Sequence, residues 1–203
     1  MVSPFYFFLG ATTWPVIHGP YRYSITGLEN LPATGGMVLC ANHNSNFDPW
    51  PLGLALWPHR QLRFMAKSEL FNPVLKAPMK ATGAFPVRRG EGDMEALKTA
   101  MRLAKSGEII AMFPEGTRPG KGLRKKHEAR PHTGAGRIAL GAKVPLVPAA
   151  LKGTDGLARL KQLKVSYGKP VDIDDLHEMS HRDAAQIATD RLMEQIWKLH
   201  AEL

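Results

Sequence analysis

Residues 37–49 read MVLCANHNSNFDP, and this stretch decides the fold class of the chain. Its first five residues, 37–41, are all apolar, as expected of a strand that is covered on both faces of a parallel sheet. Asp48 followed by Pro49 is typical of a helix start, with Asp at the N-cap and Pro at the first helical position. The stretch therefore predicts a buried strand that passes through a polar loop into a helix.

The same alternation of strand and helix continues on both sides of this stretch. Further apolar runs predict strands at residues 62–66, 109–113 and 146–151, with an edge strand at 164–167. Helices are expected at residues 93–106 with Asp93 as the cap, at 134–140, and from Ser180 to the end of the chain. Strands that alternate with helices predict a single α/β domain with a mostly parallel central sheet flanked by helices.

Composition narrows the functional classes. The chain has 203 residues, 44% hydrophobic and 22% charged, which fits one globular domain and excludes wholesale disorder. Its 27 Lys and Arg against 18 Asp and Glu give a net charge of +9, which points to nucleic acid, an anionic membrane surface or a phosphorylated substrate. The single cysteine, Cys40, excludes an intrachain disulfide and any multi-cysteine metal site, and its apolar surroundings favour a core position.

The N-terminal segment, residues 4–17, contains no charged side chain and is rich in aromatics. It is shorter than the roughly 20 apolar residues that a membrane span needs. No basic residue precedes it, so it is a poor signal peptide. Two interpretations follow: a terminal helix packed on the core, or an aromatic segment that enters a membrane interface, where Trp and Tyr are favoured.

The polar loop of residues 42–48 carries the first candidate site. It follows a predicted strand, and open α/β sheets place their sites at the carboxyl ends of strands. His43 suits general-base work near neutral pH. Asp48 is close enough in sequence for a turn to fold its carboxylate back onto the imidazole. The alternatives are that Asp48 is only a helix cap, that His43 is only a loop residue, or that both bind a metal.

Two further segments carry charges at places suited to a substrate. Residues 83–89 end in adjacent arginines, Arg88 and Arg89, whose guanidinium groups offer planar forks of donors to a phosphate. Residues 113–118, FPEGTR, follow a predicted buried strand and supply a carboxylate and an arginine to hold a polar substrate. The alternatives are a solvated charged face for the first segment and an ordinary turn with a surface ion pair for the second.

A fourth segment, residues 144–149 (VPLVPA), has no polar side chain. Alone it predicts a core strand, although its apolar atoms also suit a groove for a hydrocarbon chain. In this order, the four segments resemble the glycerolipid acyltransferase family typified by 1-acylglycerol-3-phosphate acyltransferase. The first matching motif is N-H-x-S-x-x-D at residues 42–48, which contains H-x4-D. The other three are G-x-F-P-V-R-R at 83–89, F-P-E-G-T-R at 113–118 and V-P-[LIV]-V-P at 144–148.

The resemblance covers about residues 25–155 and implies a reaction. It implies a glycerol-3-phosphate acyltransferase-like fold that moves a fatty acyl group from acyl-CoA or acyl-ACP to the free hydroxyl of 1-acylglycerol 3-phosphate, giving phosphatidic acid. His43 would be the general base and Asp48 would orient it, with no cofactor and no metal. The resemblance also implies that the acceptor is bound by Arg88, Arg89, Glu115, Gly116, Thr117 and Arg118.

The basic residues between 118 and 130 suggest a surface that binds an anionic partner. This loop contains Arg118, Lys121, Arg124, Lys125, Lys126 and Arg130, opposed only by Glu128. It suits anionic lipid headgroups or an acyl carrier protein. Together with the aromatic segment it supplies two membrane signals, the minimum for stable peripheral attachment. We therefore expect a membrane-contact segment at residues 1–20, an acyltransferase domain at 21–203, and peripheral association with the cytoplasmic side of a membrane.

Three alternatives remain open from the sequence. The acceptor of an acyltransferase of this kind can instead be glycerol 3-phosphate, another lysophospholipid or an amino-lipid. A non-catalytic protein that binds membrane or nucleic acid would also explain the positive charge, but it leaves the four motifs unexplained, so nucleic acid is not expected as a partner. Metal-dependent hydrolysis is a further possibility, and it predicts that a chelator abolishes activity.

Overall fold

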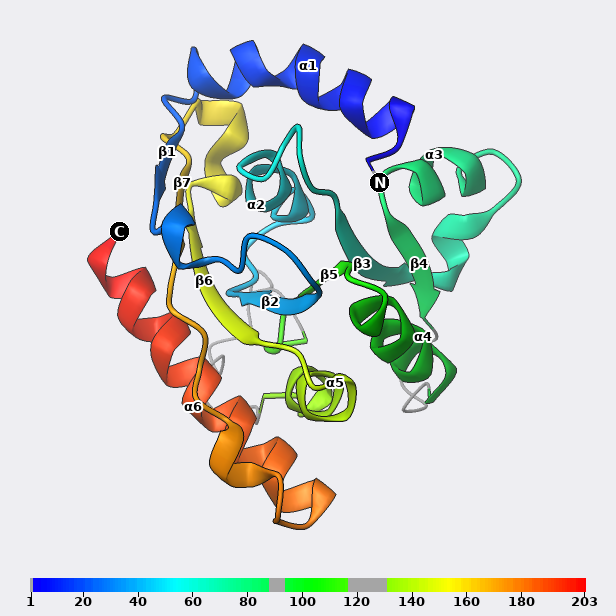
Figure 1. Ribbon diagram of the computed structural model, residues 1–203. Helices are drawn as coiled ribbons and strands as arrows, with labels where there is room; N and C mark the ends of the chain where they lie inside the picture. Colours follow the sequence, from blue (N-terminus) through cyan, green and yellow to red (C-terminus); the bar gives the residue numbers. More distant parts are fainter. Residues whose placement is uncertain (1, 88–93, 117–130) are drawn as a thin grey trace, which may run out of the picture.

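A computed structural model describes residues 2–87, 94–116 and 131–203 of the chain (Figure 1). The strands are β1 (Ser24–Thr26), β2 (Met37–Ala41), β3 (Leu62–Lys67), β4 (Ala84–Val87), β5 (Ile109–Met112), β6 (Leu146–Lys152) and β7 (Lys164–Tyr167). The helices are α1 (Pro4–His18), α2 (Pro49–Leu54), α3 (Lys76–Ala81), α4 (Met94–Lys105), α5 (Gly134–Ala142) and α6 (His181–Glu202). Within the described residues, these elements confirm the predicted α/β class.

The strands form one seven-stranded sheet in the order β1-β7-β6-β2-β5-β3-β4. Strands β2 to β6 run parallel to one another, whereas β7 is antiparallel to β6 and β1 is parallel to β7. The mostly parallel sheet that the sequence predicts is therefore confirmed. Because the parallel strands end at the same edge, the loops that follow β2, β3, β4 and β5 all emerge there.

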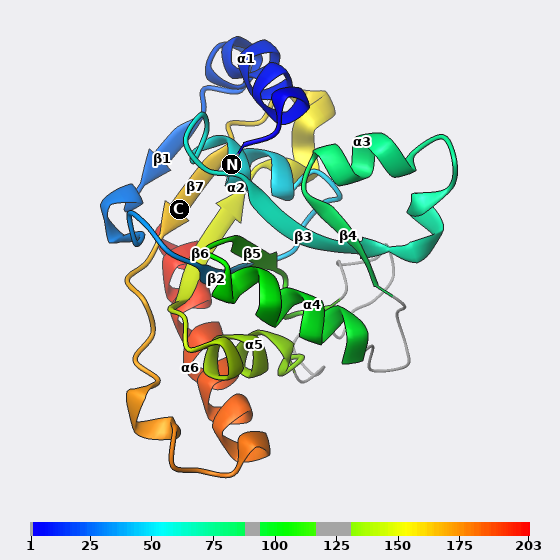
Figure 2. The same cartoon turned by 45° about the vertical axis from the view of Figure 1, so that its right-hand side comes forward.

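Strand β2 lies in the middle of the sheet and is covered on both faces. Met37, Leu39 and Ala41 belong to a core cluster that includes residues of α1 and α2. Val38 and Cys40 belong to a second cluster, formed with α4, α5 and α6. All five β2 residues are completely buried, as their uniformly apolar sequence predicts. Figure 2 shows the resulting arrangement, with α1 and α3 on one side of the sheet and α4, α5 and α6 on the other.

Four elements differ from the sequence-based expectations. The predicted edge strand at 164–167 is internal, because β1 pairs with it and occupies the edge. Strand β1 is only three residues long, too short to show a periodic pattern. Strand β4 and helix α3 were also not predicted, and each is short and contains a proline. Helix α4 confirms the helix expected at 93–106, although Asp93 lies outside the described residues.

The N-terminal segment is a helix with one part packed on the core and another part exposed, so it agrees partly with each of the two interpretations of its sequence. In α1, Gly10 and Ile17 are buried, and Trp14 packs against the core. In contrast, Phe5, Phe7 and Phe8 are 44%, 50% and 65% exposed. None of the helices in the described ranges has the length and apolarity needed to cross a bilayer.

Two buried tyrosines fix the position of helix α2. The Tyr23 hydroxyl donates to the carbonyl of Pro51, and the Tyr167 hydroxyl donates to the carbonyl of Leu52 over 2.7 Å. Burial raises the pKa of both hydroxyls well above the ordinary value for tyrosine, so both remain neutral donors. Because α2 begins directly after Asp48, these bonds also fix the position of the loop of residues 42–48, which carries the candidate site.

We expect Tyr167→Phe to lower the free energy of unfolding by about 1–2 kcal/mol, because it leaves the buried Leu52 carbonyl without its donor. Urea denaturation followed by circular dichroism measures the effect. Tyr21→Phe is the matched control, since the Tyr21 hydroxyl donates to Leu157 over 3.2 Å at a partly buried position. A Tyr167→Phe loss no larger than that of the control would contradict the anchoring role.

Candidate active site

The loop after β2 is fastened to the neighbouring strand by a side-chain amide. Asn42 Nδ2 donates to the carbonyl of Leu151 over 2.9 Å, and the amide of Leu151 donates to Asn42 Oδ1 over 2.8 Å. The last β2–β6 register pair is Ala41 with Ala149, so this reciprocal pair continues the ladder one step beyond the strand. Asn44 Nδ2 donates to the same Leu151 carbonyl over 3.2 Å. The chain therefore turns away from the sheet at a fixed place.

Asp48 folds back onto His43, as the spacing of the two residues predicts. His43 Nδ1 lies 2.7 Å from Asp48 Oδ2. The same oxygen accepts from the amides of Asn44 and Ser45 over 2.7 and 2.9 Å. The Asp48 side chain is completely buried and makes no hydrogen bond to the amides of α2, although it occupies the N-cap position. Its carboxylate is therefore used to orient the histidine and the loop rather than to cap the helix.

The His43 ring is also held on one face. It stacks on the ring of Phe113, with the centroids 4.4 Å apart and the planes 20° from parallel. Phe113 follows β5, which is the neighbour of β2 in the sheet. The His43 side chain is only 11% exposed. One nitrogen and one face of the imidazole are thus fixed by residues from two separate motifs.

The third motif brings a second histidine to this edge. Gly116 has a φ of +69°, and an added Cβ would lie 2.2 Å from Cδ2 of His132. The His132 amide donates to the carbonyl of Pro114 over 2.9 Å, which holds the two segments together. Glu115 is half-buried. Gly116 is therefore needed for the close approach of the His132 ring, a contact that the sequence analysis missed.

The remaining predicted site residues are only partly located. Arg88, Arg89, Thr117 and Arg118 lie outside the described residues, as do the other basic residues at 121–130. Strand β4 pairs with β3 in parallel and ends at Val87, at the same edge of the sheet as His43. Glu115 and Gly116 follow β5 at that edge. The structure thus brings the first and third motifs together, whereas the two arginines of the second motif lie outside the described residues.

The fourth motif and Cys40 both have the places that their sequence context predicts. Residues 146–149 of the fourth motif are buried in β6, so this segment is the core strand that its apolar sequence predicts. Cys40 is completely buried, and burial raises the pKa of its thiol far above the ordinary value. A thiol of this kind is a core side chain and not a nucleophile. Among the described residues, no three His, Cys, Asp or Glu side chains are grouped to hold a metal ion.

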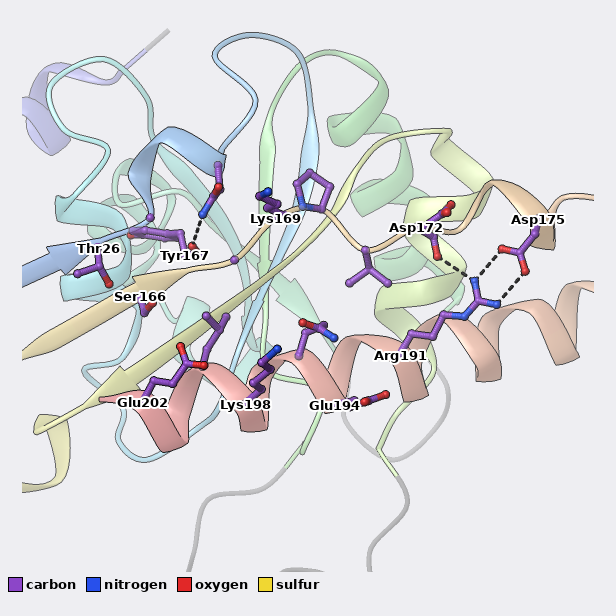
Figure 3. A pocket seen from close by; sticks show the side chains of 17 residues that line it. Thr26, Ser166, Tyr167, Lys169, Asp172, Asp175, Arg191, Glu194, Lys198 and Glu202 are labelled. Carbon is purple, nitrogen blue, oxygen red and sulfur yellow. Dashed lines mark hydrogen bonds and ion pairs between the residues drawn. The ribbon is translucent and has the colours of Figure 1, made fainter.

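An open cavity of about 870 Å³ lies elsewhere, between α6, the ends of β1 and β7, and the segment that follows β7 (Figure 3). Because β7 is antiparallel to β6, this segment runs toward the start of β6, where Val171 bridges to Leu146. None of the residues that line the cavity belongs to the loop that carries His43 or to residues 113–116. Its Arg191 binds both carboxylate oxygens of Asp175, over 2.7 and 2.8 Å, so these opposite charges offset each other.

The chain is similar to known proteins along most of its length. The acyltransferase family model matches residues 22–152. The 1-acyl-sn-glycerol-3-phosphate acyltransferase of Bacillus subtilis is 34% identical over 179 residues, covering 86% of this chain and 86% of that protein. The enzyme of the same name from Streptococcus pneumoniae is 31% identical, covering 81% of this chain and 61% of that protein.

A solved structure has the same fold. The crystal structure of PlsC from Thermotoga maritima, described as a 1-acyl-sn-glycerophosphate (LPA) acyltransferase, aligns with a TM-score of 0.65 and 23% identity. The alignment covers 96% of this chain and 78% of that one. At this level of identity the match concerns the architecture, a mostly parallel sheet flanked by helices, and it agrees with the fold predicted above.

Proposed function

Because this chain belongs to the acyltransferase family, we propose that it transfers a fatty acyl group from acyl-CoA or acyl-ACP to the free hydroxyl of 1-acylglycerol 3-phosphate. The product is phosphatidic acid. The observation that carries the proposal is the contact of 2.7 Å between His43 Nδ1 and Asp48 Oδ2 at the carboxyl edge of the sheet. Relatives that carry this activity in their names cover most of the chain, which supports the choice of acceptor.

In the proposed mechanism, His43 is the general base. Its Nδ1–H donates to Asp48, so the lone pair of Nε2 is available to the acceptor hydroxyl. As the hydroxyl oxygen attacks the thioester carbonyl carbon, its proton moves to Nε2. The tetrahedral intermediate then collapses, the carbon–sulfur bond breaks, and the thiolate takes up the proton from the imidazolium. No acyl-enzyme is formed, because the nucleophile is the hydroxyl of the acceptor itself.

Asp48 stabilises the positive imidazolium that forms during this step. Its burial strengthens this interaction, because the surrounding dielectric is lower than that of water. The amides of Asn44 and Ser45 hold the carboxylate oxygen in place before the substrate arrives. The ring therefore needs little reorientation when the proton moves, which is the benefit of a preorganised site.

The acceptor is proposed to bind through the second and third motifs. Arg88 and Arg89 take its phosphate as planar, charge-assisted donors. Its glycerol and phosphate are positioned by Glu115, Gly116, Thr117 and Arg118. A backbone amide near Lys67, at the end of β3, is our candidate for a donor to the oxyanion. No step of this scheme uses a cofactor or a metal.

The protein is further proposed to act at the cytoplasmic surface of a membrane. Residues 1–20 form the membrane-contact segment, supported by the exposed Phe5, Phe7 and Phe8 of α1, and residues 21–203 form the acyltransferase domain. The basic residues at 118–130 supply the attraction to anionic lipid or to an acyl carrier protein.

The decisive experiment is an assay of the purified protein with lysophosphatidic acid and a panel of acyl-CoA and acyl-ACP donors. We expect phosphatidic acid to appear, detected by mass spectrometry, with one thiol released for each acyl group transferred. Glycerol 3-phosphate and other lysophospholipids are the comparison acceptors. Absence of transfer to lysophosphatidic acid with every donor would refute the proposed substrate, and transfer to another acceptor would replace it.

Arg88→Ala tests the phosphate contact. We expect the KM for lysophosphatidic acid to rise about tenfold or more, because a charge-assisted hydrogen bond to the phosphate is lost. The KM for the acyl thioester should stay within about twofold, since the donor has no part in that contact. Arg102→Ala, on the last turn of α4, is the control. Unchanged KM and kcat for the acceptor would show that Arg88 does not bind it.

A further inference from the structure

An exposed apolar segment leaves the sheet at the same edge as His43. Strand β3 ends at Lys67, and the turn of Ser68–Phe71 leads to α3. In this stretch Val74 is 81% exposed, more than any other large apolar side chain in the described part of the chain. Leu70 and Leu75 are each 41% exposed. Exposing several apolar side chains together costs free energy unless they meet an apolar environment.

The outward position of Val74 is built into the turn. Asn72 Oδ1 accepts from the amide of Val74 over 3.1 Å and from the amide of Leu75 over 2.9 Å. The amide of Lys76 donates to the carbonyl of Asn72 over 2.9 Å, which starts α3. Asn72 thus holds a projecting turn with Val74 at its tip, so the exposure is a property of an ordered segment.

The charges around this turn indicate what it meets. Lys67, Lys76 and Lys80 flank the apolar residues, and Glu69 is the one acidic residue from position 67 to position 80. Lys76 and Lys80 are exposed on α3. Apolar side chains that project between cations suit a bilayer whose surface carries anionic lipid, where each cation adds about 1 kcal/mol of attraction.

Helix α3, which follows this turn, is joined to the start of α1. Ser3 Oγ donates to the carbonyl of Ala81, the last residue of α3, over 2.8 Å. Gln61 Nε2 donates to the same carbonyl over 2.8 Å, and the amide of Ser3 donates to Gln61 Oε1 over 3.0 Å. In Figures 1 and 2, α1 and α3 lie on the same side of the sheet. The exposed aromatics of α1 and the turn at 70–75 therefore belong to one connected part of the molecule.

We propose that residues 70–75 are a second lipid-contacting segment, which enters the surface of an anionic bilayer together with α1. The inference rests on the proposed function, because the acceptor of that reaction is a membrane lipid. A single helix on the surface leaves the domain free to rotate about its axis. The second contact removes that freedom and directs the edge that carries His43 toward the bilayer.

The first test measures binding to vesicles. The double variant Val74→Asp with Leu75→Asp is expected to bind vesicles of phosphatidylcholine and phosphatidylglycerol about tenfold more weakly than the wild type. Met179→Asp is the matched control, because Met179 is 42% exposed in the turn before α6 and lies outside the proposed surface. Circular dichroism and urea denaturation check that both variants are folded. Unchanged binding of the double variant, or an equal loss in the control, would overturn the proposal.

The second test reports insertion directly. Because Cys40 is completely buried, a cysteine introduced by Val74→Cys is the accessible thiol for a polarity-sensitive fluorophore. We expect the emission to shift to the blue on adding the anionic vesicles, and a label introduced by Met179→Cys to show no shift. Equal responses at the two positions would contradict insertion at 70–75.

The two proposals fail in different ways. Acyl transfer to lysophosphatidic acid dispersed in detergent tests the function without a bilayer, and the double variant should keep at least half of the wild-type rate there. If wild-type protein makes no phosphatidic acid in detergent, the proposed function fails, while the vesicle comparison still decides the role of residues 70–75. If transfer is normal and vesicle binding is insensitive to the substitutions, only the second segment is wrong.

Discussion

Replacing His43 with alanine is expected to lower kcat for acyl transfer by about a thousandfold, because the acceptor hydroxyl loses the base that takes its proton. The KM values for acceptor and donor should change little, since the imidazole acts mainly in the transition state. The fold should persist, because the strand and the loop are held by Asn42 and Asp48 independently of the ring. Steady-state kinetics on the purified variant measure both parameters.

A matched control separates this effect from the loss of a histidine elsewhere. His177 is exposed in the segment that precedes α6, so His177→Ala should leave both kinetic parameters unchanged. A general base contributes at least about a hundredfold to the rate. If His43→Ala retained more than about a tenth of the wild-type kcat, general-base catalysis by this residue would be ruled out.

Asp48→Asn should lower kcat by about a hundredfold or more while the KM values stay within a few-fold, because a neutral amide does not stabilise the imidazolium. The structure indicates why the fold should survive. The amides of Asn44 and Ser45 require an acceptor, and the carbonyl oxygen of asparagine can take the place of Asp48 Oδ2. Asp48→Ala removes that acceptor and should also reduce the free energy of unfolding, by about 2 kcal/mol or more.

The double variant provides the sharpest check on Asp48. If Asp48 acts through His43, then His43→Ala combined with Asp48→Asn should be no slower than His43→Ala alone. Losses that multiply would show that the two residues act independently. Thermal denaturation of each variant distinguishes a defect in catalysis from a defect in folding.

The parts of this fold that could be predicted are those that depend on residues close together in the sequence. Strand β2 is recognisable because every one of its residues is apolar, and the return of Asp48 to His43 follows from their separation by a short loop. The stacking of Phe113 on His43 depends on β5 lying beside β2, and strand order is not written in either segment. The contact of His132 with Gly116 joins residues that are far apart in the sequence, so no local pattern reveals it.

The two hydrogen bonds between the Asn42 side chain and the backbone of Leu151 have a consequence for protein engineering. Both of its hydrogen bonds involve backbone atoms of residue 151, so the identity of that side chain does not enter the contact. Position 151 should therefore accept substitution among apolar residues of similar volume without moving the histidine loop. A library that varies this position would explore packing beneath the edge that carries His43 while the contact between His43 and Asp48 stays constant.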